Sequence, residues 1–238
     1  MAPGKPRKAI RKKGSPARRP PAATLQDRGA ETRARLIDAA LDVFNELGFD
    51  GASTRRIAEA AGANLAAIVY HFGSKEALHV AVARHVADSI AANISPVFSI
   101  AATGNPLASP DAARQAVLRM LDTFIDVILG KAEAARWARF IIREQMHPTA
   151  AFEVLYEFIS GASAMASTVV AAALGQPESP ETRLHLFALM GEVLYFRVAQ
   201  PVVLRRMEWT AIDDAERAAI KRVVLSHVNA VLLAEQNR

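Results

Sequence analysis

Cysteine is absent from all 238 residues, which excludes disulfide bonds, thiolate metal ligands and a cysteine nucleophile. A chain without disulfides fits a reducing compartment, so we expect a cytoplasmic protein. The sequence also lacks GxGxxG, HExxH and GxSxG patterns, and Gly73-Ser74-Lys75 lacks the preceding glycine of a phosphate-binding loop. Its six histidines show no ligand spacing. These absences favour a protein that is not an enzyme, with no metal site and no cofactor; a small all-α enzyme is the alternative.

A membrane span is also not expected. Residues 158–177 carry no charge and are about long enough to cross a bilayer. Serine, threonine and glutamine make this stretch only mildly apolar, and its glycine and alanines suit a helix packed inside a globule. The N-terminus has basic residues without an apolar run behind them, so it does not resemble a secretory signal peptide.

Acidic residues are missing from positions 1–24, which hold eight Lys or Arg and five of the twelve prolines. Because the formal net charge of the chain is +5, the remaining residues sum to −3. Such a segment buries too little apolar surface to order itself, so we expect a disordered basic arm over residues 1–27. The arm could follow a phosphate backbone, serve only as a solubilising extension, or make the chain a membrane-surface or protein-interaction module.

What the rest of the chain does contain is apolar residues at helical spacing, with no sustained period-two alternation. We therefore expect an all-α fold: a three-helix helix-turn-helix domain at 28–84 and a helical ligand-binding and dimerisation domain at 85–238. Capping residues, glycines and prolines set the expected helices. These are 33–47, 54–61, 64–71, 75–93, 110–129, 132–147, 149–174, 180–205 with a kink at Pro201, and 213–235.

The second and third of these helices, joined by a turn at Gly62, form a helix-turn-helix, whose second helix lies in the DNA major groove. Helix 64–71 is short and mostly apolar. Leu65 or Ile68, with Phe72, can anchor it in the core, while small apolar side chains on the other face can contact thymine methyl groups. The remaining candidates are polar groups that reach bases or phosphates. The candidate DNA-binding residues are Thr54, Arg55, Asn64, Ala66, Ala67, Val69, Tyr70, His71 and Lys75.

Three of these candidates have a simpler interpretation. Asn64 can be only a helix cap, and Ser53 or Thr54 can cap the preceding helix. His71 can be half-buried and hydrogen-bonded within the domain. Tyr70 and Lys75 are the stronger candidates, because the Lys75 ammonium lies in the first turn of a helix, where free backbone amides also suit a phosphate.

Residues 31–82 resemble the DNA-binding domain of the TetR family of transcriptional regulators almost from end to end. The motifs that carry the resemblance are G-F-D-G-A-S-T, R-I-A-E-A-A-G and Y-H-F-G-S-K-E-A-L. The family implies phosphate contacts near Thr54, Tyr70 and Lys75, and base or backbone contacts from Ala66, Ala67 and His71. Many members have tyrosine where this chain has Val69, and a small polar residue where it has Ala67. Specificity is therefore expected to depend on apolar contacts and DNA shape.

Two stretches of the C-terminal part, REQMHPTAAF and LHLFALMGEVLYFRVAQPVVLRRMEW, are similar to the CecR-like branch of that family. The family implies a homodimer in which two long helices pair with their twofold mates in a four-helix bundle. The sequence offers an apolar stripe on each helix, although ordinary monomer core is the alternative. The expected interface residues are Leu184, Phe187, Gly191, Tyr195, Val198, Val224, His227 and Val231.

The family also implies a small-molecule effector that binds in the C-terminal domain and moves helix 75–93, which changes the separation of the two recognition helices. We thus expect a ligand-responsive repressor that binds a palindromic double-stranded operator and is released by its effector. Most candidate effector contacts can instead be plain core, and Arg143 and Glu144 can find partners on neighbouring helices. The candidates are Phe98, Met120, Phe124, Trp137, Phe140, Arg143, Glu144, His147 and Tyr156.

Overall fold

The computed structural model of the chain describes residues 25–102 and 105–236, so the predicted arm lies outside the described residues as far as residue 24. Within these ranges all regular structure is helical, which confirms the all-α expectation. The described helices are α1 (Leu25–Gly51), α2 (Thr54–Ala60), α3 (Leu65–Phe72), α4 (Lys75–Ala102), α5 (Pro110–Gly130), α6 (Ala132–Met146), α7 (Ala150–Ala173), α8 (Pro180–Val198), α9 (Gln200–Met207) and α10 (Asp214–Gln236).

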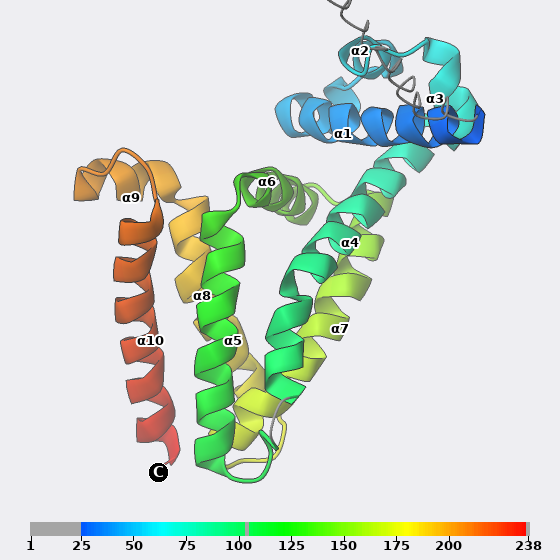
Figure 1. Cartoon of the computed structure of the whole chain (residues 1–238). Helices are drawn as coiled ribbons and strands as arrows, with labels where there is room; N and C mark the ends of the chain where they lie inside the picture. Colours follow the sequence, from blue (N-terminus) through cyan, green and yellow to red (C-terminus); the bar gives the residue numbers. More distant parts are fainter. Residues whose placement is uncertain (1–24, 103–104, 237–238) are drawn as a thin grey trace, which may run out of the picture.

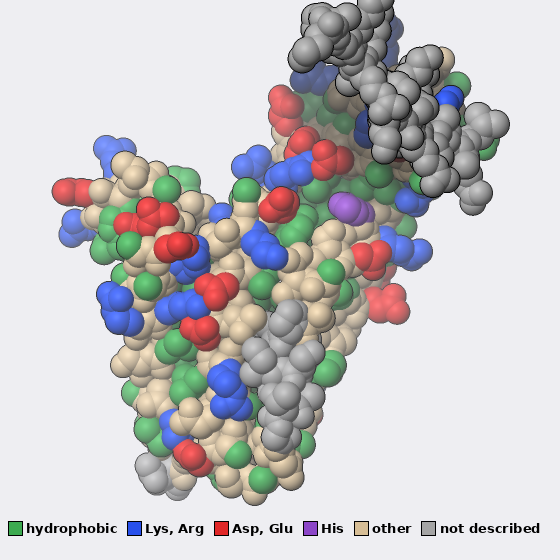
Figure 2. Space-filling view, viewed as in Figure 1, with side chains coloured by type: hydrophobic (Ala, Val, Ile, Leu, Met, Phe, Trp, Pro, Cys, Tyr) green, Lys and Arg blue, Asp and Glu red, His purple; other side chains and the backbone are tan. Residues whose placement is uncertain are grey.

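The helices form a small head on a larger body (Figure 1). The head consists of α1, with α2 and α3 packed on it. Helix α4 runs from the head into the body alongside α7, and α5, α8 and α10 make the other half of the body. Helix α6 lies below α1, between the two halves. On the face shown in Figure 2, acidic and basic side chains are intermingled over α5 and α10. There Lys221 binds both Asp122 and Asp126, which joins α10 to α5.

A single apolar core joins the head to the top of the body. It contains the buried stripe of α1, including Leu36, Leu41 and Phe44, together with Trp137 of α6 and Leu155 of α7. The expected domain boundary between residues 84 and 85 falls inside α4, which continues through it without a break. The head therefore shares its core with α6 and α7 and is not packed as a separate unit.

Polar contacts strengthen the same junction between α1 and α6. The Arg136 guanidinium of α6 binds Asp42 at 2.7 Å and Asp38 at 2.8 Å, two acidic residues one turn apart on α1. One turn further along α1, the side-chain amide of Asn45 donates to the Arg136 carbonyl at 3.1 Å. Helix α6 is consequently attached to the 38–45 segment of α1 by polar contacts as well as by packing.

Three expected helix bounds were wrong. Helix α1 begins at Leu25 and not at residue 33, so residues 25–27 of the expected arm are helical. The expected helix 180–205 is two helices, α8 and α9, which meet at Ala199 with a bend of 72°. Pro201 lies in the first turn of α9, where its missing N–H costs no hydrogen bond, so it begins a helix and does not kink one. Helix α4 continues to Ala102, past the expected end near residue 93.

The uncharged stretch identified in the sequence lies mostly in α7. Among the described helices, α7 is long and apolar enough to cross a membrane, and the bent pair α8–α9 also qualifies if it is counted as one helix. A core helix of a globular domain meets the same criterion. Helix α7 packs against α4, α5, α6 and α8.

Candidate nucleic-acid interface and its support

The start of α2 is fixed by Ser53 and not by Thr54. The Ser53 hydroxyl oxygen accepts from the Arg56 N–H at 3.1 Å and so caps the helix. The half-buried Thr54 hydroxyl is therefore not needed as a cap. Arg55 points into solvent and pairs with Glu59 one turn later, at 3.2 Å. Both side chains lie at the first turns of α2, where a helix-turn-helix crosses the DNA backbone.

Helix α3 is anchored through one side chain and capped by another. The Asn64 side-chain oxygen accepts from the Ala66 N–H at 2.9 Å, so Asn64 serves as the helix cap. Ile68 is 1% exposed and belongs to the head core, and Phe72 is half-buried against that core. The sequence left either Leu65 or Ile68 as the anchor, and in the structure Ile68 is the buried one.

The opposite face of α3 is apolar and uncovered. Val69 is 64% exposed and Tyr70 is 84% exposed. Ala66 is exposed too, whereas Ala67 is half-buried and packs against the core. Leu65, at 47% exposure, lies on the same face one turn before Val69 and was missed as a candidate. The i, i+4 spacing of Leu65 and Val69 was the signal that could have identified it.

The polar candidates at the end of α3 lie close together. The ring of His71, which is half-buried, meets the ring of Tyr70 edge-on with centroids 4.9 Å apart. No hydrogen bond described in the structure involves the Tyr70 hydroxyl, which is free to donate to a phosphate. This end of α3 therefore offers an aromatic hydroxyl beside an imidazole.

Lys75 contacts the backbone of the turn between α1 and α2. Its ammonium donates to the carbonyls of Phe49 at 3.0 Å and Ala52 at 3.2 Å, and it lies 4.3 Å from the centre of the Phe49 ring. The carbonyls at the end of a helix lack partners within the helix and attract a cation. Lys75 is thus directed toward the turn between α1 and α2 in the structure without DNA.

The candidate effector residues whose side chains the structure describes lie in different parts of the molecule. Trp137, Phe140 and Glu144 are buried in the core shared by head and body. Met120 and Phe124 lie half-buried on α5, while His147 and Tyr156 are exposed. The side chain of Phe98 lies outside the described residues. Arg143 approaches the end of α1, so the alternative that it finds its partner on a neighbouring helix is supported.

Glu144 also finds its partners nearby. Its carboxyl accepts from the Thr149 hydroxyl at 2.8 Å and the Thr149 N–H at 3.2 Å, and lies 3.4 Å from the His79 ring. Burial, together with the charge of Lys75, lowers the pKa of His79 to about 4. The imidazole is therefore uncharged at neutral pH, and the contact with Glu144 is polar packing between α4 and α6, not an ion pair.

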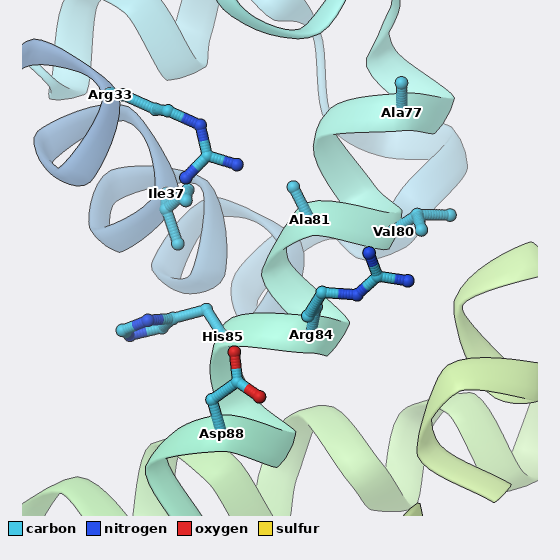
Figure 3. A pocket seen from close by; sticks show the side chains of 8 residues that line it. All are labelled: Arg33, Ile37, Ala77, Val80, Ala81, Arg84, His85 and Asp88. Carbon is cyan, nitrogen blue, oxygen red and sulfur yellow. The ribbon is translucent and has the colours of Figure 1, made fainter. Parts of the chain in front are cut away.

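Two surface grooves lie on the head. The first, of about 280 Å³, runs between α1 and the beginning of α4 (Figure 3). Its lining includes Arg33 and Arg84, but none of the candidate effector residues. The second, of about 360 Å³, is lined on α1 by residues that include Asp38, Asp42 and Glu46. Both grooves are open to solvent and lie away from the expected effector region.

The candidate dimer residues on α8 share one outward face. Leu184, Phe187, Tyr195 and Val198 are each more than half exposed, and a side chain added at Gly191 would meet open space. The candidate dimer residues on α10 do not all lie on one exposed face. His227 faces outward and contacts Glu192 at 3.0 Å, and Val231 is half-buried. Val224, in contrast, is 3% exposed and packs in the body core, so it cannot contribute to an exposed face.

A capped, solvent-facing recognition helix on an all-helical body defines a DNA-binding protein of the helix-turn-helix class. Comparison with known proteins then identifies the family. Residues 36–82 match the bacterial regulatory proteins of the tetR family, and residues 113–235 match the C-terminal domain of the HTH-type transcriptional dual regulator CecR. The chain belongs to the TetR family of transcriptional regulators.

Individual relatives agree with this assignment. The chain is 37% identical over 216 residues to the HTH-type transcriptional dual regulator CecR of Shigella flexneri, covering 89% of this chain and 95% of that protein. The fold is similar to that of the regulator FadR from Bacillus subtilis in complex with stearoyl-CoA (TM-score 0.59, 15% identity, 83% of this chain and 97% of that chain). It is also similar to AibR in complex with isovaleryl coenzyme A and operator DNA (TM-score 0.60, 15% identity, 82% and 97%).

Proposed function

We propose that the protein is a ligand-responsive repressor that binds a palindromic DNA operator as a homodimer and releases it when a small-molecule effector binds. The observation that carries this proposal is the uncovered apolar face of α3, with Val69 64% and Tyr70 84% exposed. A short helix gains nothing from such a face in water, whereas the major groove offers it thymine methyl groups and a close approach of the backbone.

The outward face of α8 supports the homodimer. Large apolar side chains at positions 184, 187, 195 and 198 are spaced to lie along one side of the helix, and each leaves more than half of its surface in water. Gly191 in the middle of this face allows a second helix to approach closely. A twofold pair would cover both copies of the face and present two recognition helices to the half-sites of a palindrome.

For the effector, we propose the small apolar cluster between α4, α5 and α7. Among the described side chains, Ile94 and Val127 are buried there, and Met120, Phe124 and Phe158 are partly buried around them. Partly buried apolar side chains from three helices can line a site for an apolar ligand. Because two neighbours in fold are described in complex with acyl-CoA thioesters, we propose an effector with an acyl chain. The relatives named as regulators also favour a non-enzymatic role and a cytoplasmic location.

Selection of DNA by the protein tests the proposed function. The full chain should enrich a palindromic duplex from a random pool, and that duplex should compete out random DNA in a gel-shift assay. Tyr70→Ala should weaken binding roughly tenfold or more, because a hydrogen bond to a charged phosphate is lost in each half-site. Thr168→Ala, an exposed change on α7, serves as the control. Enrichment of no sequence, or full affinity in Tyr70→Ala, would contradict the proposal.

The nature of the contact can be tested on the DNA itself. Replacing thymine by deoxyuridine in the selected duplex removes only methyl groups, and should weaken binding about fourfold for each contacted methyl, at about 0.8 kcal/mol per buried carbon. In Val69→Ala the affinities for the two duplexes should differ less, because the variant lacks the valine side chain that contacts the methyl group. Equal affinity of wild type for both duplexes would exclude methyl readout while leaving operator binding in place.

A further inference from the structure

Helix α6 makes a second connection between the head and the body. The first connection is α4, which continues from the head into the body without a break (Figure 1). Long helices bend, so α4 by itself does not fix the angle of the head on the body. Helix α6 packs against α1 of the head and also against α5 and α7 of the body. The angle of the head therefore depends on how α6 is attached to its neighbours.

Arg136 attaches the first half of α6 to α1. Its Nε atom donates to the Asp42 carboxylate at 2.7 Å, and its Nη2 atom donates to the Asp38 carboxylate at 2.8 Å and to the Asp38 carbonyl at 3.1 Å. The guanidinium holds its donors in a rigid plane, so two acceptors one turn apart define its orientation. Asn45 donates back from α1 to the Arg136 carbonyl at 3.1 Å. These hydrogen bonds span about two turns of α1 and fix the direction of α6 along it.

The last turn of α6 is attached to α4 and α7 by a buried polar cluster. The Glu144 carboxyl lies 3.4 Å from the His79 ring of α4 and accepts at 2.8 Å from the hydroxyl of Thr149, which caps α7. The same hydroxyl lies 3.2 Å from the other ring nitrogen of His79. Glu144 is 2% exposed and His79 is 3% exposed. Buried polar groups favour one arrangement, because any other leaves them without hydrogen bonds.

The two attachments lie about two turns apart on α6, and the segment between them is embedded in the shared core. Trp137 and Phe140 of this segment are buried with the apolar stripe of α1. A close-packed core resists sliding of one helix past another. A displacement of α6 in the body is therefore transmitted to α1, the helix on which α2 and α3 pack.

We infer that α6 sets the spacing of the two half-sites that the dimer binds, and that Arg136 and Glu144 are the positioning residues for this spacing. Helix α6 acts from the side of α1 that faces the body, whereas α2 lies on the opposite side (Figure 1). In a twofold pair, a change of head angle in each subunit changes the separation of the two recognition helices. The inference rests on the proposed function and adds residues that determine its specificity without contacting DNA.

Arg136→Gln tests the attachment to α1, because glutamine removes the charge and the planar set of donors. Affinity is measured for the palindrome that the wild type selects and for two derivatives with one base pair inserted or deleted at the centre. Each derivative shifts the half-sites by about 3.4 Å and rotates them by about 35°. The wild type should bind the derivatives about a hundredfold more weakly, since the two heads no longer bind together. In Arg136→Gln this ratio should fall about fivefold, because a partly exposed ion pair restrains the angle only modestly and is lost in both subunits.

Arg217→Gln is the matched control. Arg217 also binds two aspartates, Asp126 and Asp214, but it joins α10 to α5 within the body. This variant should keep the wild-type ratio. Asp42→Asn should lower the ratio in the same direction as Arg136→Gln, and the two changes together should add little to either one, because both remove the same contact.

His79→Phe tests the other end of α6 and leaves α6 itself unchanged. The new ring keeps the packing against Phe44, Phe49 and Phe140 and removes the contact with Glu144. The ratio between the selected palindrome and its derivatives should fall here too, by about as much as in Arg136→Gln. A wild-type ratio in this variant would show that Glu144 does not position the head.

The angle of the head can also be measured without DNA. Because the chain has no cysteine, spin labels attach only at cysteines introduced in place of Glu59 on α2 and Thr168 on α7, which are both exposed. Labelled chains mixed with an excess of unlabelled chains report the distance between the two labels of one chain by electron spin resonance. Arg136→Gln should broaden the distribution of this distance, whereas Arg217→Gln should leave it unchanged.

Two results would overturn the inference. A wild-type ratio among the three duplexes, or an unchanged label distance, in Arg136→Gln would show that the attachment does not fix the angle of the head. An equal loss of affinity for all three duplexes, with a lower midpoint of urea unfolding, would show that Arg136 contributes only to stability. The label experiment requires no operator. A wild type that selects no palindrome therefore contradicts the proposed function, and a label distance that stays narrow in Arg136→Gln contradicts the role of α6.

Discussion

Val69→Glu is expected to lower operator affinity about a thousandfold while leaving the free energy of unfolding within about 0.5 kcal/mol of the wild type. The side chain is 64% exposed, so a carboxylate there stays in water in the free protein. In the complex it would enter the groove between two phosphate strands and lose its hydration. Like charges brought together at an interface cost several kcal/mol, and a homodimer carries the change twice.

Gel-shift titration on the selected duplex, with urea unfolding in parallel, measures both quantities. Met165→Glu is the matched control, because Met165 is 57% exposed on α7 and the substitution changes the net charge equally. The control should bind with an affinity within about twofold of the wild type, since one charge far from the DNA is largely screened by salt. Comparable losses in the two variants would mean that the effect is one of net charge and that α3 does not enter the groove.

Phe187→Glu is expected to produce monomers and to weaken operator binding about a hundredfold. Phe187 is 57% exposed in the single chain, so the change should leave the protomer folded. In a twofold pair it would bury carboxylates from both subunits in an apolar interface, without partners. Each head then binds its half-site alone and loses the gain of simultaneous binding, which commonly amounts to a factor of 10² to 10⁴.

Sedimentation at micromolar concentration checks the oligomeric state, and the gel-shift assay checks the DNA affinity. Met165→Glu again serves as the control and should sediment with the wild type. A Phe187→Glu variant that remains dimeric would place the interface elsewhere, and a monomer that retains full operator affinity would separate dimerisation from DNA recognition.

Most helices were predictable because their ends carry local signals. Ser109, Thr149 and Ser179 each cap a helix through a side-chain hydrogen bond, as their positions before an apolar run indicate. The break between α8 and α9 was harder to place. Pro201 indicates some discontinuity, but a kinked helix and a new helix leave the same local pattern, and only the packing of the body decides between them.

The exposure of the candidate residues could be predicted where it follows from the helical period. It could not be predicted where it depends on contacts with residues distant in the sequence. Tyr70 and Val69 were expected on the open face of α3 because Leu65 or Ile68, with Phe72, had to point inward. The contacts of Lys75 in the free chain were not predicted, because its partners, the Phe49 and Ala52 carbonyls, lie more than twenty residues earlier and have no side-chain signature. The buried placement of Trp137 and Phe140 likewise reflects contacts with α1 that no local pattern reveals.

The core shared by α1, α6 and α7 limits how such a regulator can be rebuilt. A head grafted from another member of the family would bring its own α1 surface, and would need acidic groups facing Arg136 and a space for Trp137 to fill. New DNA specificity is therefore more readily acquired by exchanging the few exposed residues of α3 than by transplanting a whole head. In this architecture the exposed face of α3 can change without affecting the packing. Residues of α1 in the shared core must change together with those of α6 and α7.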